Sequence, residues 1–257
     1  MKNTEEEYLT SVKNALKMLK SFSMDEPKKS ITDLATSLGL SKSTVSRTMA
    51  TLASEGFVYK DPQTRKYRLG LSILSLSGIV NTNMDIHRES QPVLYKLVEK
   101  LDETAHISVL DNLDNIYLHK VECNHPVRVL THIGKRNPPF CTSSGKVLLA
   151  HADPEIVNQV IEKGLKRFTK YTITNSDSLL HELKQIKENG YAFSMEEFNE
   201  GVNSVAAPVF DYRGKVIAAI TIVGPKQRVS SHKIQKLAKQ VIRAGLEISN
   251  RIGYINH

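Results

Sequence analysis

The chain has 257 residues, of which 40% are hydrophobic and 24% are charged. This length allows one large or two modest domains, and this composition is that of an ordinary globular protein rather than a disordered or membrane-embedded one. The formal net charge is +8, and residues 9–70 hold 11 Lys and Arg against 5 Asp and Glu. A basic N-terminal segment of this kind is a weak indication of nucleic-acid binding.

The sequence carries no signal for export or membrane insertion. Its first residues include Glu5, Glu6 and Glu7 and no apolar core, so we expect no signal peptide. No apolar run approaches the roughly 20 residues of a membrane helix. Cys123 and Cys141 suit a reducing compartment, so we expect free thiols and a cytoplasmic protein.

The first predicted helix lies upstream of residue 23. Apolar residues recur there at helical spacing and would supply the third helix that a small DNA-binding domain needs to enclose a core. These residues are Val12, Ala15, Leu16, Leu19 and Phe22.

Two short helices joined by a tight turn are predicted next. Ser30 can cap the first helix, with Asp33 in its first turn, and Gly39 can take the left-handed conformation that ends it. Ser41 can cap the second helix, which has one packing face and an opposite arc of short, polar and basic side chains. The packing face holds Val45, Thr48, Met49 and Leu52. The arc holds Lys42, Ser43, Ser46, Arg47 and Ala50.

A basic hairpin follows and completes the pattern of a winged helix-turn-helix. Residues 57–60 and 67–69 predict two strands, and Asp61-Pro62 is typical of a turn. We expect the second helix to lie in the major groove and the hairpin to hold phosphates, although a solvated polar face on an ordinary helix is the simpler alternative. The candidate DNA-binding residues are Ser41, Lys42, Ser43, Thr44, Ser46, Arg47, Lys60, Arg65, Lys66 and Arg68.

Residues 69–80 are apolar and small, which is too short for a membrane span and too apolar for a solvated linker. We expect a helix that joins two domains and packs against a second copy of itself, because a dimer suits a protein that reads two half-sites. Packing within the same chain is the alternative. The apolar positions are Leu71, Ile73, Leu74, Leu76 and Ile79.

A second domain of helices and a mostly antiparallel sheet is predicted from residue 85 onward. A long helix with an interior Pro92 begins it, and alternating or β-branched segments predict strands at 107–110, 116–121, 127–133, 204–210 and 216–223. Further helices are predicted at 144–151, 154–163, 178–188 and 231–252. The fold class is therefore α+β, with a DNA-binding domain at 9–69, a linker helix at 70–84 and an effector-binding domain at 85–257.

Two ordered motifs stand in the second domain. One is the run from Gly134 through Gly145-Lys146 to Ala150. The other begins at Gly190 and continues with Ser194 and Glu197, and its later positions are Ser204-Val205-Ala206 and Val209-Phe210-Asp211. With the winged helix, these motifs resemble the IclR family of bacterial transcriptional regulators over most of the chain, from residue 12 to residue 253.

The resemblance implies a homodimeric or tetrameric regulator that binds double-stranded operator DNA. It also implies a GAF-like C-terminal domain that binds a small organic acid and no other cofactor. The pocket positions that it implies are Ser143, Ser144, Ser194, Ser204, Thr221 and Val223. Ser194 stands where many members have an acidic residue, and Val223 where some have a hydroxyl, so we expect a less acidic pocket than is usual.

The residues themselves also indicate where an acid would bind. Thr142, Ser143 and Ser144 lead into a helix at Gly145, so backbone N–H groups and hydroxyls would form a cradle for a carboxylate. The candidate effector-binding residues are therefore Thr142, Ser143, Ser144, Gly145, Ser194, Ser204, Thr221 and Val223. For Ser204, Thr221 and Val223, core packing on strands is the alternative.

Other functions receive less support. Cys141 could act as a nucleophile with a histidine base, but no signature of a cysteine hydrolase surrounds it. The Gly145-Lys146 pair is not a phosphate loop, because Phe140 occupies the position of the first glycine. A metal- or redox-responsive regulator is the milder alternative, with His119, Cys123 and His125 as its candidate residues.

We therefore predict a transcriptional regulator, without catalytic or metal-ligating residues, whose operator affinity changes when a metabolite binds. We expect it to control an operon for the breakdown of a carbon source.

Overall fold

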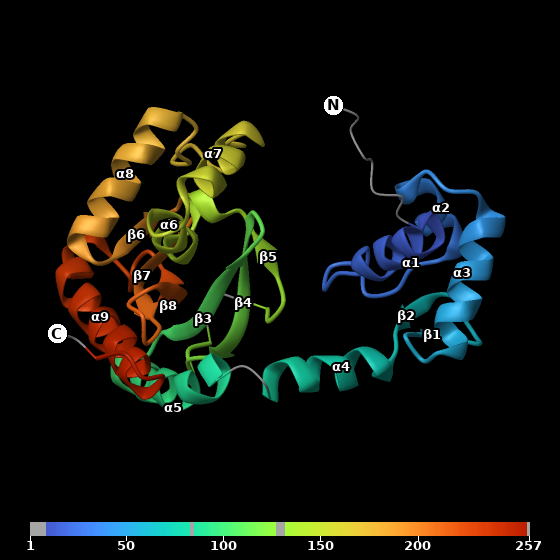
Figure 1. Cartoon of the computed structure of the whole chain (residues 1–257), viewed down its shortest axis with the longest axis horizontal. Helices are drawn as coiled ribbons and strands as arrows, with labels where there is room; N and C mark the ends of the chain where they lie inside the picture. Colours follow the sequence, from blue (N-terminus) through green and yellow to red (C-terminus); the bar gives the residue numbers. More distant parts are fainter. Residues whose placement is uncertain (1–8, 83–84, 127–131, 256–257) are drawn as a thin grey trace. The chain divides into compact units, whose positions relative to one another are not determined.

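The computed structural model describes residues 9–82, 85–126 and 132–255 (Figure 1). The chain divides into two compact units, Met1–Asn83 and Met84–His257. No helix within the described ranges is long and apolar enough to cross a bilayer.

Unit 1 consists of short helices and a two-stranded hairpin, followed by the helix α4 (Figure 1). Its elements are α1 (Thr10–Lys20), α2 (Ile31–Leu38), α3 (Lys42–Ser54), β1 (Val58–Lys60), β2 (Tyr67–Leu69) and α4 (Leu71–Thr82). The predicted order of helix, helix-turn-helix and wing is confirmed.

The helix ends in unit 1 follow from local chemistry. Ser30 Oγ accepts a hydrogen bond from the Asp33 backbone N–H at 3.1 Å, and the Asp33 carboxylate accepts one from the Ser30 N–H at 2.8 Å. These bonds form the capping box that begins α2. Gly39 ends α2 with φ +64°, and Ser41 Oγ accepts from the Thr44 N–H to begin α3. The three caps predicted from sequence are thereby confirmed.

The core of unit 1 joins all three N-terminal helices to the hairpin. Its buried members are Met18, Leu34, Ala35, Val45, Met49, Val58 and Tyr67. The prediction for α1 is partly wrong, because Val12 and Leu16 are each 51% exposed whereas Met18 is fully buried. A helical period identifies an apolar stripe, but packing against the neighbouring helices decides which residues of that stripe are buried.

Backbone hydrogen bonds join the wing, which is the β1–β2 hairpin, to the segment before α2. Val58 pairs with Leu69 across the hairpin, and the backbone of Lys29 bonds in both directions with that of Tyr67, at 2.9 and 2.8 Å. The Asp61 carboxylate accepts hydrogen bonds from backbone N–H groups in the turn, which also lower the pKa of that carboxyl. The predicted hairpin and its turn are confirmed, and the Lys29 bridge is an addition that the sequence did not indicate.

Unit 2 is built on one six-stranded sheet in its described part (Figure 1). Its helices are α5 (Asp85–Leu101), α6 (Ser143–Ala150), α7 (Pro154–Glu162), α8 (Ser176–Asn189) and α9 (Ile234–Arg251), with the short helices η1 (Pro139–Cys141) and η2 (Ser231–Lys233). Its strands are β3 (Thr104–Asp111), β4 (Asp114–Val121), β5 (Arg136–Asn137), β6 (Ala192–Met195), β7 (Val202–Phe210) and β8 (Val216–Pro225).

All strand pairs in this sheet are antiparallel, and the strand order is β5-β4-β3-β8-β7-β6. Successive side chains of β3, β7 and β8 point to opposite faces. One face packs Ile107, Val205 and Ile220 against α5 and α9. The other packs Ala206 and Ala219 against α6 and α8. The α+β class and the mostly antiparallel sheet are confirmed.

Some elements differ from the predictions. The strands β5 and β6 are too short to produce an alternating pattern, and the sequence did not indicate either as a strand. The strand predicted at 127–133 falls mostly outside the described residues, and His132 and Ile133 lie in no strand. Pro92 lies inside α5, as predicted.

Candidate functional site

The recognition face is the exposed arc of α3. Arg47, Ser43 and Ser46 are exposed there, whereas Val45 and Met49 on the opposite side are buried in the unit 1 core. This division of the helix into a packed and a polar side is as predicted. Short side chains next to one long guanidinium allow a helix backbone to come close to base edges.

Three of the predicted DNA-binding hydroxyls have partners within the protein. Thr44 is half-buried, and its Oγ1 lies 2.9 Å from Ser41 Oγ. Ser41 Oγ also lies 2.9 Å from Ser43 Oγ. Ser41 and Thr44 therefore contribute to the helix start, whereas Ser43 is exposed on the arc.

Two cationic side chains of the wing pack against aromatic rings. Arg68 lies over the Tyr59 ring at 4.7 Å, and Lys60 lies over the Tyr67 ring at 5.4 Å. Lys60 is half-buried rather than exposed as we expected, because it packs on this ring. Arg65 and Lys66 at the hairpin end are exposed, as is Lys42 at the start of α3.

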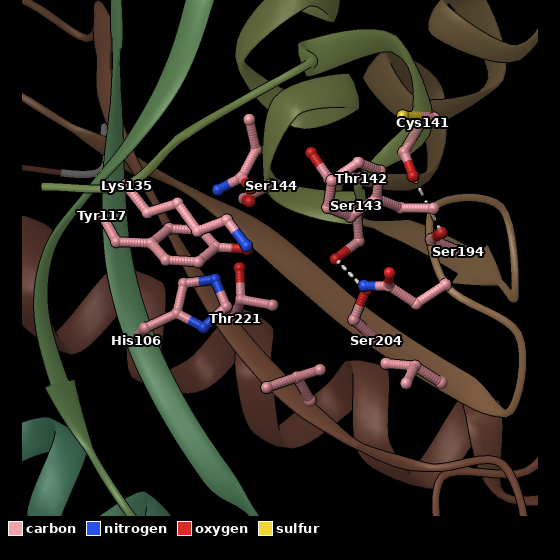
Figure 2. A pocket seen from close by; sticks show the side chains of 15 residues that line it. His106, Tyr117, Lys135, Cys141, Thr142, Ser143, Ser144, Ser194, Ser204 and Thr221 are labelled. Carbon is pink, nitrogen blue, oxygen red and sulfur yellow. Dashed lines mark hydrogen bonds between the residues drawn. The ribbon is translucent and has the colours of Figure 1, made fainter. Parts of the chain in front are cut away.

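Unit 2 holds a pocket between α6 and the face of the sheet that α6 covers (Figure 2). The cavity volume is about 60 Å³, enough for a few water molecules or a compact metabolite. Its walls combine strand residues, the N-terminal turn of α6 and the loop after β6. The lining residues are His106, Tyr117, Lys135, Asn137, Cys141, Thr142, Ser143, Ser144, Ser194, Phe198, Asn199, Val202, Ser204, Thr221 and Val223.

The first turn of α6 opens into this pocket. Thr142 caps the helix by accepting a hydrogen bond from the Gly145 N–H at 3.2 Å. The N–H groups of Ser143 and Ser144 lie in the first turn, where a helix supplies no acceptor of its own. Asn115 Nδ2 donates to Ser144 Oγ at 2.8 Å, and Ser143 Oγ donates to Ser204 Oγ at 2.7 Å. The geometry suits a carboxylate at the positive end of the helix.

The sheet side of the pocket is polar and buried. His106 on β3 pairs directly with Thr221 on β8, and each is 1% exposed. The His106 ring lies 4.1 Å from the Tyr117 ring, centroid to centroid. Burial lowers the pKa of His106 to about 3 and raises that of Tyr117 to about 12, so both side chains are neutral at pH 7.

A buried ion pair fixes the loop that closes one side of the pocket. Lys146 Nζ on α6 is 2.7 Å from Glu197 Oε1, 2.9 Å from Glu182 Oε1 and 2.9 Å from the Phe193 carbonyl oxygen. Burial raises the pKa of Glu197, and the charge of Lys146 opposes this shift. With three acceptors, Lys146 serves to hold β6, α8 and the loop after β6 together, and its charge is already compensated.

Seven of the eight predicted effector residues line this one pocket. Gly145 does not, because it packs beneath η1: a Cβ there would lie 2.3 Å from the Pro139 carbonyl oxygen. Sequence reasoning did not select His106, Tyr117, Lys135 or Asn137. A polar residue amid the apolar alternation of a strand, such as His106, is the signal that could have identified this group.

The residues considered for catalysis and for metal binding are not arranged for these functions in the described part of the chain. Burial raises the pKa of the Cys141 thiol to about 12, which suppresses the thiolate that a nucleophile needs. Both cysteines are free thiols, as predicted. The His119 ring lies 4.7 Å from the His87 ring, centroid to centroid, at an angle of 58°, and His125 Nε2 lies 2.9 Å from Asp102 Oδ2. Within the described ranges, no three potential metal ligands are grouped.

Comparison with known proteins assigns each of the two units to a family. Residues 11–62 match the family described as the IclR helix-turn-helix domain, and residues 79–250 match the bacterial transcriptional regulator IclR C-terminal family. The HTH-type transcriptional regulator KdgR of Escherichia coli K12 is 36% identical over 225 residues, which are 87% of this chain and 86% of KdgR.

Solved structures of this family share the fold. A putative IclR transcriptional regulator from Silicibacter sp. TM1040 is 28% identical, with a TM-score of 0.85 over 96% of this chain and 98% of that one. An IclR homologue of Microbacterium hydrocarbonoxydans, in complex with 4-hydroxybenzoate, has a TM-score of 0.83 at 23% identity over 94% of this chain and 98% of its own. The chain therefore belongs to the IclR family of DNA-binding transcriptional regulators, which are not enzymes.

Proposed function

We propose that this chain is an effector-responsive regulator that binds an operator through α3 and the wing, and a small carboxylate through the pocket of unit 2. The observation that carries the proposal is the first turn of α6, which lies with the Ser143 and Ser144 side chains at a pocket lined by several polar residues. A concave pocket with a few convergent polar groups is the usual form of a small-molecule site.

On the DNA side, one group of residues contacts base edges and another contacts phosphates. Ser43, Ser46 and Arg47 lie on the exposed arc and contact base edges in the major groove. Exposed cations around them hold phosphates and give affinity without sequence preference. These cations are Lys42, Arg65, Lys66 and Arg68.

On the effector side, the pocket accommodates a compact acid. Its carboxylate is held at the start of α6, and the exposed Lys135 adds a positive charge to the lining. The 4-hydroxybenzoate bound by a family homologue supports an organic acid as the ligand. We propose that the acid comes from a carbon source whose breakdown operon this regulator controls in the cytoplasm.

The effector and the operator must be linked reciprocally, because each can influence the other only through states that both discriminate. We propose that the functional form is a dimer or a dimer of dimers joined through α4. This helix exposes large apolar side chains in the single chain, namely Leu71, Leu74, Leu76, Ile79 and Val80.

A binding selection on genomic fragments, run with and without small carboxylates, tests the proposal. We expect enrichment of one palindromic sequence, and a change in affinity when an acid is added. Arg47→Ala should relax the preference for particular base pairs, whereas Lys66→Ala should weaken all sequences alike and lower the salt slope by about one. Identical preference profiles for the two variants would contradict these roles, and the absence of any enriched fragment would overturn the function.

A further inference from the structure

The pocket holds buried polar atoms that have no partner within the described part of the protein. Neither ring nitrogen of His106 has a hydrogen-bond partner within the described residues, nor does Thr221 Oγ1 or Asn137 Nδ2. The three residues are between 1% and 2% exposed. Since a buried polar group without a partner costs about 1–3 kcal/mol, such a cluster in a cavity indicates a missing ligand or water.

Two of these groups are neighbours in the sheet. His106 and Thr221 are directly paired residues of β3 and β8, and Figure 2 shows both beside Tyr117 and the Lys135 side chain on one side of the pocket. Asn137 lies on β5 and pairs with Asn115 of β4, whose side chain bonds to Ser144, so Asn137 belongs to the α6 end of the pocket. His106 and Thr221 form a single surface, which we call the sheet end of the pocket.

The opposite end, at α6, is different. Ser143 donates to Ser204, Ser144 accepts from Asn115, and Ser194 Oγ donates to the Cys141 carbonyl oxygen at 3.3 Å. Side-chain hydroxyls there are already paired, so its free capacity is the backbone N–H groups of the helix start. Apart from Asn137 Nδ2, the buried side-chain atoms of the lining residues that lack a partner in the described chain are thus at the sheet end.

The chemistry of the sheet end selects one kind of group. Burial keeps His106 neutral, so its ring offers one donor and one acceptor and no positive charge for a carboxylate. The Thr221 hydroxyl also both donates and accepts. A carboxylate or a carbonyl group accepts only, whereas an alcohol hydroxyl satisfies a donor and an acceptor at once.

We propose that His106 and Thr221 form a subsite for an alcohol hydroxyl, so that the effector is a hydroxylated carboxylic acid rather than a plain one. This inference rests on the proposed function, in which the carboxylate occupies the α6 end. It identifies the sheet end as the part of the pocket that determines specificity among acids. A bound water could fill the same place, and the experiment separates the two.

The test is isothermal titration of the full-length protein with matched acids of two to six carbons, each offered with and without a hydroxyl. Suitable pairs are glycolate and acetate, 4-hydroxybutyrate and butyrate, and 6-hydroxyhexanoate and hexanoate. We expect a hydroxylated member to bind about tenfold or more tightly than its plain partner, as for a buried hydroxyl that finds its hydrogen bonds. His106→Phe and Thr221→Val should each remove most of that advantage and leave the plain acid's affinity within about threefold.

Ser108→Ala is the matched control. Ser108 is a fully buried residue of the same strand β3 whose hydroxyl also lacks a partner among the described residues, but it does not line the pocket. The control should keep the preference for the hydroxylated acid. Equal affinity for both members of every pair would overturn the subsite and leave the proposed function intact, as expected if water fills the sheet end. Failure of every acid to bind would overturn both.

Discussion

His106 is a histidine that the fold keeps uncharged. It is fully buried between the sheet and the pocket, with the Tyr117 ring 4.1 Å away and no carboxylate among its contacts in the described chain. Desolvation therefore disfavours the protonated ring, and nothing compensates for it. The same burial that suits this ring to a neutral hydroxyl makes the folding of unit 2 sensitive to acid.

The pH dependence of stability follows from this pKa. An unfolded chain protonates His106 near pH 6.5, but the folded chain does so only near pH 3, so the free energy of unfolding falls as the pH drops between these values. The slope from this residue is at most about 1.4 kcal/mol per pH unit. Urea unfolding at pH 7 and pH 5.5 should show a smaller loss for His106→Gln than for the unmodified protein. Equal losses would show that His106 is protonated in the folded state.

The helix ends in unit 1 show how neighbouring residues determine where a helix begins and ends. Ser30 and Asp33 satisfy each other's backbone N–H groups, and these hydrogen bonds also lower the pKa of the Asp33 carboxyl. Gly39 then allows a left-handed backbone at φ +64°, which turns the chain tightly into α3. The orientation of the recognition helix thus depends on three local choices of residue.

Removing this cap should destabilise unit 1. We expect Ser30→Ala to lower the free energy of unfolding by about 1 kcal/mol, since the Asp33 N–H loses its acceptor. Thermal unfolding followed by circular dichroism would measure the change. Ser37→Ala, which removes a hydroxyl from an exposed position later in α2, should cost much less. A similar loss for the two variants would contradict the importance of the capping box.

At the scale of the molecule, the two units are compact and α4 lies at their junction in the sequence. Its apolar side chains are unusually exposed for a single chain: Leu71 is 79% exposed and Leu74 is 68% exposed. A second copy that covers them would remove this surface from water and would bring two recognition helices together.

Charge on α4 should therefore weaken self-association. We expect Leu74→Lys to lower the dimerisation constant by tenfold or more, because about 1.5–3 kcal/mol comes from burying a leucine side chain. Sedimentation velocity over a range of concentrations would measure it. Ser77→Lys adds the same charge at an exposed polar position of α4 and should have a smaller effect. If neither variant differed from the unmodified protein, α4 would not be the dimer contact.

Much of the fold could be predicted from short-range pattern. The capping residues of α2 and α3, the β1–β2 hairpin and the alternation of β7 and β8 all arise from neighbouring residues, so the sequence indicated them directly. The strands β5 and β6 are held by pairing with β4 and β7, and no local period marks them. Likewise, the exposure of Leu16 and the burial of Met18 depend on how α1 docks on its neighbours.

The sequence by itself determined the winged helix-turn-helix, the polar arc of α3 and the hydroxyl-rich start of α6, because caps, turns and helical faces depend on residues a few positions apart. Only the tertiary structure decided that His106, Thr221 and Asn137 share the pocket with that helix start. The pairing of β3 with β8, which no local period encodes, places His106 beside Thr221, and β5 brings Asn137 to the same pocket from the edge of the sheet.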